Sequence, residues 1–222
     1  MRKIQLIVFL LLSSNYLCSQ TNNTDLLIGD INNKIEFLRY LEPNFNIQDL
    51  VSQEIQEVFF IKNAGLIILS PYLETLFEKC GLTINNEFID KQSIFIAVRL
   101  LEYAAIGKAG SEENELVINK LLCGLSVLDT IVVNINLSNE NKEIVDDLLN
   151  AVIQHWTVLG NTSIDGLRLS FLQREGRLEE HEEQYNLNVE QKAYDTLLDH
   201  IPWSFHNIGL KWMEKNILVE WR

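Results

Sequence analysis

The segment Leu148-Leu149-Asn150-Ala151-Val152-Ile153-Gln154-His155-Trp156, followed by Leu167-Arg168-Leu169-Ser170-Phe171-Leu172-Gln173-Arg174, is the centre of the stretch that decides the fold. The whole stretch runs from Asn63 to Gly176 and contains several segments in which apolar residues recur at helical spacing. A glycine follows each segment, and a glycine in that place can adopt the left-handed conformation that ends a helix. The sequence therefore predicts helices that end at Gly81, Gly107, Gly124, Gly160 and Gly176.

Polar residues precede these segments and predict where the helices begin. A serine or aspartate side chain can accept a hydrogen bond from a backbone N–H group that has no partner in the first turn. Proline suits the first helical position, because its missing N–H group would have no partner there. The expected starts are Ser70, which precedes Pro71, and Asp90, Ser111, Ser138 and Ser163.

The run Leu66–Leu69 is apolar on every side. We expect it to be buried, and the alternative is a contact surface for another chain.

After Gly176 the pattern changes from helical to extended. Arg177 to Glu190 predicts a polar hairpin, and Ala193 to Leu198 predicts a short helix. The ranges Trp203 to Leu210 and Ile217 to Trp221 favour two extended segments. Helices first and strands last predict an α+β fold, mainly α, in which a helical bundle is followed by a small C-terminal antiparallel β portion.

Two further segments do not belong to this series of helices and C-terminal strands, and the sequence predicts a structure for each. Leu50 to Val58 has helical spacing and predicts a helix that ends in Phe59-Phe60-Ile61. Ile131 to Leu137 alternates between apolar and smaller or polar residues, and predicts a short strand or an extended connection.

Composition limits the class of protein and of partner. The chain has 222 residues, of which 47% are hydrophobic and 22% are charged, so it can bury one good core. Its formal net charge of −13 argues against binding to nucleic acid, because phosphate binding needs a local surplus of Lys and Arg. A partner surface is expected to be basic or apolar.

The first twenty residues resemble a secretory signal peptide. Arg2-Lys3 precedes the apolar run Ile4 to Leu12, and small polar residues follow. The apolar run is too short to span a bilayer comfortably, so no stable membrane span is expected after signal removal. The alternatives are a mis-assigned start of the sequence and a loose N-terminal helix. Removal of the signal would leave Cys80 and Cys123 as the only cysteines. They would be buried free thiols, or one disulfide in an exported chain.

Residues typical of catalytic or metal sites do not form a recognisable pattern. The four histidines lack metal-ligand spacing, and the phosphate loops, the dinucleotide fingerprint and the nucleophile elbow are missing. Cys123 lies in an apolar helix, which favours packing over nucleophilic chemistry. We therefore expect no catalytic, cofactor-binding or metal-binding residues, no cofactor and no small-molecule substrate.

Two arginines and three tryptophans remain as candidates for contacts with another protein. Arg168 and Arg174 either hold carboxylates within the fold or bind acidic residues of a partner. Trp203, Trp212 and Trp221 serve either as core residues or as interface anchors.

These residues lie in blocks that resemble the tape measure proteins of contractile injection systems, the phage-tail-like particles of bacteria. The blocks are Ile61 to Leu73, Asn119 to Gly124, Ala151 to Trp156, Asn161 to Gly176, and Leu197 to Trp221 with gaps. They cover about three quarters of the chain in order. The candidate protein-contact or family-motif residues are Asn63, Gly65, Pro71, Asn119, Lys120, Gly124, Trp156, Arg168, Phe171, Gln173, Arg174, Trp203, Trp212, Glu220 and Trp221.

The resemblance implies a non-enzymatic structural role in setting the length of the particle tube. Partners would be tube, baseplate or other particle proteins. About 200 residues would reach only ~300 Å even as one helix, so the chain looks like the family's C-terminal globular region, without a long measuring segment. The expected organisation is a signal-like segment (1–20), an N-terminal extension (21–57) and a family globular domain (58–222).

The sequence leaves two possibilities open for the localisation and for the function. The signal-like start suggests export, whereas the resemblance suggests cytoplasmic assembly into a particle. The alternative function is an exported helical binding protein that has lost the injection-system role.

Overall fold

A five-stranded sheet joins the two ends of the folded region. The computed structural model describes residues 57–131 and 135–221, and Gln56–Arg222 forms one compact unit. The strand order is β1-β4-β5-β7-β6, with bounds β1 Val58–Ile61, β4 Gly176–Glu180, β5 Gln184–Val189, β6 Asn207–Ile208 and β7 Asn216–Glu220. The expectations for residues 1–20, for the extension to residue 56 and for a helix from Leu50 lie outside the described residues.

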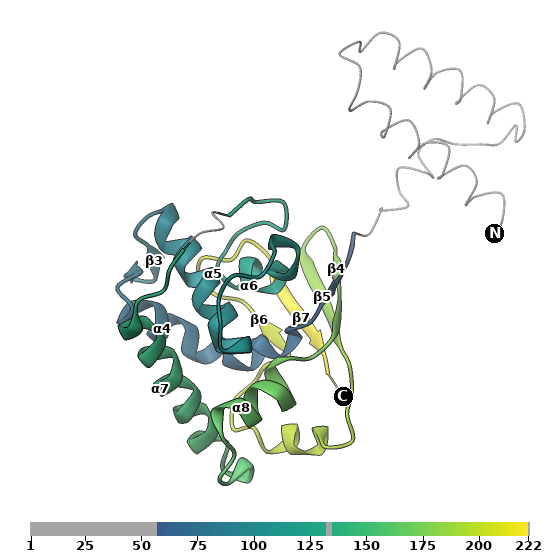
Figure 1. Cartoon of the computed structure of the whole chain (residues 1–222). Helices are drawn as coiled ribbons and strands as arrows, with labels where there is room; N and C mark the ends of the chain where they lie inside the picture. The colour runs from purple at the N-terminus through teal and green to yellow at the C-terminus, as the bar shows by residue number, and fades with distance from the viewer. Residues whose placement is uncertain (1–56, 132–134, 222) are drawn as a thin grey trace, which may run out of the picture. The chain divides into compact units, whose positions relative to one another are not determined.

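The helical part lies between β1 and β4 in the chain and packs on one face of the sheet (Figure 1). Its helical elements are η1 Ala64–Tyr72, α4 Leu73–Lys79, α5 Lys91–Ile106, η2 Glu113–Glu115, α6 Val117–Leu122, α7 Asn139–His155, η3 Thr157–Leu159, α8 Ile164–Leu167 and η4 Arg168–Leu172. A small hairpin of β2 Thr83–Ile84 and β3 Glu87–Phe88 precedes α5, and η5 Asp195–His200 follows β5. The α+β, mainly helical class predicted from the sequence is confirmed.

The sheet differs from the prediction in two details. Phe59-Phe60-Ile61 was predicted to end a helix but lies in β1, which pairs antiparallel with β4. β-branched and aromatic residues suit a half-buried strand, and here Ile61 is buried while Phe60 points to solvent. The C-terminal β portion is not purely antiparallel, because β7 returns after η5 and the short β6 to run parallel to β5.

Three of the predicted helix starts and three of the helix ends have the expected geometry. Asp90 accepts a hydrogen bond from Ser93 N–H at 2.7 Å. The hydroxyl groups of Ser138 and Ser163 likewise accept a hydrogen bond from the backbone N–H group three residues later, each at 3.1 Å. Gly107 ends α5 with a φ of 73°, and Gly81 and Gly124 follow α4 and α6 with φ values of 67° and 76°. The ends predicted at Gly160 and Gly176 differ, because α7 already ends at His155 and Gly176 begins β4. Local capping chemistry thus located the starts of α5, α7 and α8.

The starts predicted at Ser70 and Ser111 are wrong. A tight helical segment already begins at Ala64 and continues through Pro71 into α4. Its run Leu66–Leu69 is fully buried, as expected. Ser70 has no free first-turn N–H groups to cap, because the helical segment runs through it and no helix begins there. After Ser111 the chain makes only the short turn η2, and α6 begins at Val117.

The C-terminal elements follow the prediction in part. The hairpin of β4 and β5 is confirmed. The short helix predicted from Ala193 is instead the tight turn η5, and the two extended segments contain β6 and β7. Ile131 and Ile135–Leu137 have no regular secondary structure, and residues 132–134 lie outside the described part.

One face of the sheet carries the core, and the other is polar. Inward-facing side chains alternate along the strands, as the buried Leu178, Leu187, Val189, Ile217 and Val219 show. The intervening residues of β5 and β7 are half-buried or exposed. Within the described ranges, no helix has the length and apolar character needed to cross a membrane.

Candidate functional site

Two of the candidate residues close the C-terminus of α5. A helix leaves its last carbonyl groups without partners. Arg168 Nε donates to the carbonyl oxygen of Ala104 at 3.1 Å. Gln173 Nε2 donates to that of Ala105 at 3.0 Å. The charge of Arg168 also suits the negative end of the helix dipole, so a distant segment caps α5.

Arg168 also connects α5 to α7. Its guanidinium donates to Asp146 at 3.0 Å and to Asp165 at 3.2 Å, and lies over the ring of Tyr103 at 5.2 Å. The Tyr103 hydroxyl donates to Asp146 at 3.1 Å, and burial raises the pKa of Tyr103. The structure thus shows the intramolecular pairing that the sequence left as one of two options for Arg168.

The turn that presents these side chains is a π-helical segment, η4. Gln173 N–H donates to the carbonyl oxygen of Arg168 at 2.8 Å, a bond that spans five residues. Such turns are rare and frequently occur at functional sites. η4 packs against η1 at Gly65, where a Cβ atom would lie 1.6 Å from the carbonyl oxygen of Phe171. Only glycine allows the two backbones to approach so closely.

Arg174 forms a buried ion pair with Asp195. The two side chains meet at 2.5 Å, and each is almost fully buried. Arg174 also donates to the carbonyl oxygens of Ser170 at 2.6 Å and Glu190 at 3.0 Å. Asp195 accepts further bonds from the Trp221 indole N–H at 3.1 Å and from a backbone N–H at 2.8 Å. This ion pair therefore holds η4, η5 and the end of β7 together.

All four tryptophan indole N–H groups have hydrogen-bond acceptors inside the molecule. Trp156 donates to the carbonyl oxygen of residue 197 at 3.0 Å, and Trp203 to that of residue 68 at 3.0 Å. Trp212 donates to that of residue 122 at 2.9 Å, which closes the end of α6. The backbone of Trp212 also contacts Gly124, where a Cβ would lie 2.3 Å from a carbonyl oxygen. The tryptophans therefore stabilise contacts within the fold.

The remaining candidates divide into buried and exposed residues. Asn63 donates to Asn119 at 2.7 Å, and both are buried. Lys120 is buried and pairs with Glu113 at 2.6 Å. Pro71 and Glu220 are exposed, Pro71 in η1 and Glu220 on the polar face of the sheet.

Asn63 and Gln173 meet at a groove beside the end of α5. The groove has a volume of about 520 Å³ and separates η4 from the loop before α6. Leu169 lines it with 67% of its side chain exposed, although it lies between the buried residues Arg168 and Phe171. The groove is lined by Lys62, Asn63, Glu102, Ile106, Lys108, Ser111, Glu115, Leu116, Leu169 and Gln173.

Glu102 fixes the backbone of the loop on one side of this groove. It accepts from Arg99 at 2.8 Å, and from the backbone N–H groups of Gly110 at 2.9 Å and Ser111 at 2.6 Å. Burial acts to raise the pKa of Glu102, but the hydrogen bonds from Arg99, Ser111 and Gly110 together lower it below its ordinary value. The carboxylate therefore stabilises the folded state in its charged form.

We expect this carboxylate to make part of the stability depend on pH. The folded-state pKa is lower than the unfolded one, so the contribution is complete above the unfolded value of about 4.3. It is then lost as pH falls through the folded value. In urea unfolding between pH 3 and 7, the Glu102→Gln variant should be less stable at pH 7 and lose less stability below about pH 4.3 than the unmodified chain. Glu112→Gln at an exposed site should keep the original profile. An unchanged acid loss in Glu102→Gln would contradict the prediction.

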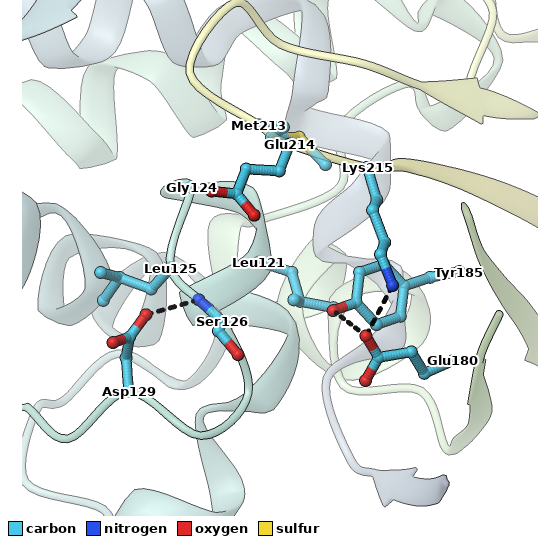
Figure 2. Close-up of a pocket in the computed structure, with 10 residues that line it drawn as sticks. All are labelled: Leu121, Gly124, Leu125, Ser126, Asp129, Glu180, Tyr185, Met213, Glu214 and Lys215. Carbon is cyan, nitrogen blue, oxygen red and sulfur yellow. Dashed lines mark hydrogen bonds and ion pairs between the residues drawn. The ribbon is translucent and has the colours of Figure 1, made fainter. Parts of the chain in front are cut away.

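A second hollow lies between the end of α6 and the end of the sheet where β4 stops and β5 and β7 begin (Figure 2). Its volume is about 140 Å³. Figure 2 shows Leu121 and Leu125 on the side of α6 and the loop after it, opposite Tyr185, Glu180 and Lys215. Carboxylates at Asp129, Glu180 and Glu214 make its lining acidic, with Lys215 as a counter-charge.

Three polar side chains of this hollow, Tyr185, Glu180 and Lys215, pair with one another. Tyr185 donates to Glu180 at 3.2 Å, and Lys215 donates to the same carboxylate at 2.8 Å. Burial first, and then the Glu180 charge, raise the pKa of Tyr185 well above its ordinary range. The phenol therefore keeps its proton at neutral pH and is unsuited to act as a base or nucleophile.

The two described cysteines form no disulfide, and the pKa of each thiol is raised. Burial, and to a lesser degree Glu140, raise the pKa of the Cys80 thiol to about 11. Burial raises the pKa of Cys123 further above its ordinary value. A thiol is a nucleophile only as a thiolate, so neither residue has the required environment. Among the described residues, no group of three or more metal-ligating side chains converges.

Sequence reasoning did not find either hollow. Of the residues around the hollow in Figure 2, only Gly124 was a candidate. Leu169 was not among the candidate residues, and its exposure agrees with helical spacing, because it lies two residues from the buried Leu167 and Phe171, on the opposite side of the turn. The alternation of apolar and polar residues in the hairpin predicted that Tyr185 lies on a strand. Its proximity to Lys215 could not be predicted, because it depends on the parallel pairing of β5 with β7.

Comparison with known families gives one match. A family model described as "Contractile injection system tape measure protein" matches residues 20–221. The match thus covers almost the whole chain and begins well before Ile61, where the resemblance was first evident. No curated protein and no solved structure matches the chain.

Proposed function

Since the chain belongs to the contractile injection system tape measure protein family, we propose that it is a non-enzymatic assembly component that docks on a tube or baseplate protein of such a particle. The family match over residues 20–221 is the observation that carries this proposal. The structural role that the family description indicates supports the non-enzymatic part of this proposal.

We propose the groove beside the end of α5 as the docking surface. Most of the candidate residues are buried, so in this proposal Arg168 and Arg174 support docking by fixing η4 rather than by touching the partner. Gln173 and Leu169 line the groove and make the contact. An exposed leucine beside a polar wall suits a partner that inserts an apolar side chain.

A single substitution tests this surface. Leu169→Glu should leave the chain folded, because the side chain is 67% exposed, and should greatly reduce its recovery in purified particles. Leu128→Glu is the matched control, since Leu128 is 80% exposed and lies away from the groove residues in sequence. It should leave recovery unchanged. Circular dichroism verifies folding, and equal recovery of both variants would refute the groove as the contact.

The test of the function itself is recovery from native cells. Sheathed particles are purified, and mass spectrometry identifies whether the chain is present and with which N-terminus. Presence with Met1 or its neighbours supports assembly in the cytoplasm. Absence from particles, with a mature chain that begins near Thr21 in an exported fraction, supports the alternative of an exported helical binding protein. The signal-like run Ile4 to Leu12 is the observation that favours that alternative.

A further inference from the structure

The groove beside the end of α5 contains a buried hydrogen-bond acceptor without a donor. Asn63 lines the groove and is 6% exposed. Its Oδ1 atom is buried, and no donor of residues 57–131 or 135–221 bonds it. A buried polar atom of this kind is rare in folded proteins and costs free energy until a donor reaches it. It therefore points to a ligand that donates hydrogen bonds.

Backbone carbonyl groups, which can only accept, fix the orientation of this amide and of a second one. Asn119 Nδ2 donates to the carbonyl oxygen of Val98 at 3.4 Å, so Asn119 Oδ1 is the atom that faces Asn63. Asn63 Nδ2 donates to it at 2.7 Å, and Asn63 Oδ1 points away from Asn119. Gln173 Nε2 donates to the carbonyl oxygen of Ala105 at 3.0 Å, which leaves Gln173 Oε1 as a second acceptor at the groove. Rotation of either amide would place two acceptors against each other, so the two oxygens stay available to a ligand.

The Lys62–Glu115 ion pair adds a carboxylate to these acceptors. The two side chains meet at 2.8 Å, and that of Lys62 is 78% exposed. The hydrogen bond and the charge of Lys62 lower the pKa of Glu115, whereas the nearby charge of Glu102 acts to raise it. An exposed ion pair contributes little to stability, so another cation can replace Lys62 without loss of the fold. Lys62 therefore holds, from within the chain, a position suited to a cation of a partner.

The lining of the groove favours a long side chain as the ligand. Since the Asn63 oxygen is buried, a donor must enter the groove to reach it, and a long side chain enters further than a backbone N–H group. Ile106, Leu116 and Leu169 supply apolar contacts for the stem of such a side chain. Lys108 also lines the groove, but its exposed side chain can turn its charge toward solvent. The guanidinium group of arginine has several N–H donors in one plane, so it can serve acceptors from different elements at once.

We propose that the groove binds an arginine side chain of the partner protein. The guanidinium group donates to Asn63 Oδ1, to Gln173 Oε1 and to the Glu115 carboxylate. Lys62 then leaves the carboxylate, and an apolar neighbour of the arginine contacts the exposed Leu169. The net charge of −13 attracts a basic surface, and arginine is often a residue that carries much of the binding energy. The inference rests on the docking surface proposed above and names the residue of the partner that enters it.

Nuclear magnetic resonance titration of the full chain with acetyl-Leu-Arg-amide tests the proposal. The side-chain amide signals of Asn63 and Gln173 report directly on the two acceptors. Both should shift with a common dissociation constant, and added salt should raise this constant because an ion pair forms. Acetyl-Leu-citrulline-amide has the same shape without the charge, and acetyl-Leu-Glu-amide reverses the charge. The first should bind about threefold more weakly, and the second should leave the signals in place.

Two substitutions at the exposed ion pair should act in opposite directions. Glu115→Gln removes the carboxylate, so the dissociation constant for acetyl-Leu-Arg-amide should rise about threefold. Lys62→Gln removes the competing cation and should lower the constant about twofold. The matched controls are Glu112→Gln, outside the groove lining, and Lys192→Gln, in the exposed ion pair with Glu190. Both controls should leave the constant unchanged.

The proposal is overturned if the Asn63 and Gln173 amide signals do not move, or move equally with acetyl-Leu-Glu-amide. It is also overturned if Lys62→Gln weakens binding as Glu115→Gln does, because the ion pair would then only support the fold. Particle recovery is measured separately with Leu169→Glu. A peptide that binds the groove, together with normal recovery of Leu169→Glu, would refute the docking function and leave the arginine site. Lost recovery without peptide binding would keep docking and reject the arginine.

Discussion

Arg174→Met should lower the free energy of unfolding by about 3–5 kcal/mol, because it leaves Asp195 buried without its counter-charge. Asp195 would keep only its bonds from Trp221 and from a backbone N–H. The side chains of both members of the pair are 3% exposed or less, so water cannot replace the lost partner. Urea unfolding followed by tryptophan fluorescence measures the loss.

Two controls separate the buried charge from a general effect of losing an arginine. Arg177→Met removes an arginine that pairs with Glu179 on the half-exposed part of β4, and should cost less than about 1 kcal/mol. The double variant Arg174→Met with Asp195→Leu removes both buried charges, and should recover much of the stability. Equal losses in the single and double variants would show that the pair matters through packing alone.

Gly65→Ala should have the other large effect, a loss of more than about 4 kcal/mol of stability or failure to fold. A Cβ at this position would lie 1.6 Å from the Phe171 carbonyl oxygen and 2.9 Å from the Cα of Leu172. Both are backbone atoms of η4, so no side-chain rotation can relieve the clash. Soluble yield and thermal unfolding measure the effect.

Gly209→Ala is the control for this prediction. A Cβ there would meet only the amide end of the Asn216 side chain, at 2.5 Å. Both residues are exposed, and the amide can move. The variant should stay within about 0.5 kcal/mol of the unmodified chain. A stable, folded Gly65→Ala protein would mean that η1 and η4 do not pack as closely as described.

The two predictions concern the same structural unit. Gly65 lets η4 approach η1, and the Arg174–Asp195 pair fixes the end of η4 against η5. The groove proposed for docking has Leu169 and Gln173 of this region on one side. Loss of either contact should therefore also reduce recovery in particles, but only in proportion to the loss of folded chain.

Local chemistry in the sequence determined where several elements begin and end. The caps at Asp90, Ser138 and Ser163 depend on contacts three residues apart, and the left-handed Gly107 depends on its own backbone. The hairpin of β4 and β5 is equally local. The α+β class and the family resemblance could be recognised for the same reason, because they rest on patterns that lie within short segments.

Only the tertiary structure decided the roles of the candidate residues. Arg168 caps a helix whose last carbonyl groups lie more than sixty residues away in sequence, and Trp203 donates to a carbonyl 135 residues away. β1 became a strand because β4 supplies its hydrogen bonds, although its own spacing continued a helical pattern. Sequence spacing fixes which side chains share a face of one element, whereas the pairing of distant backbone groups decides which of them are buried and which reach the surface.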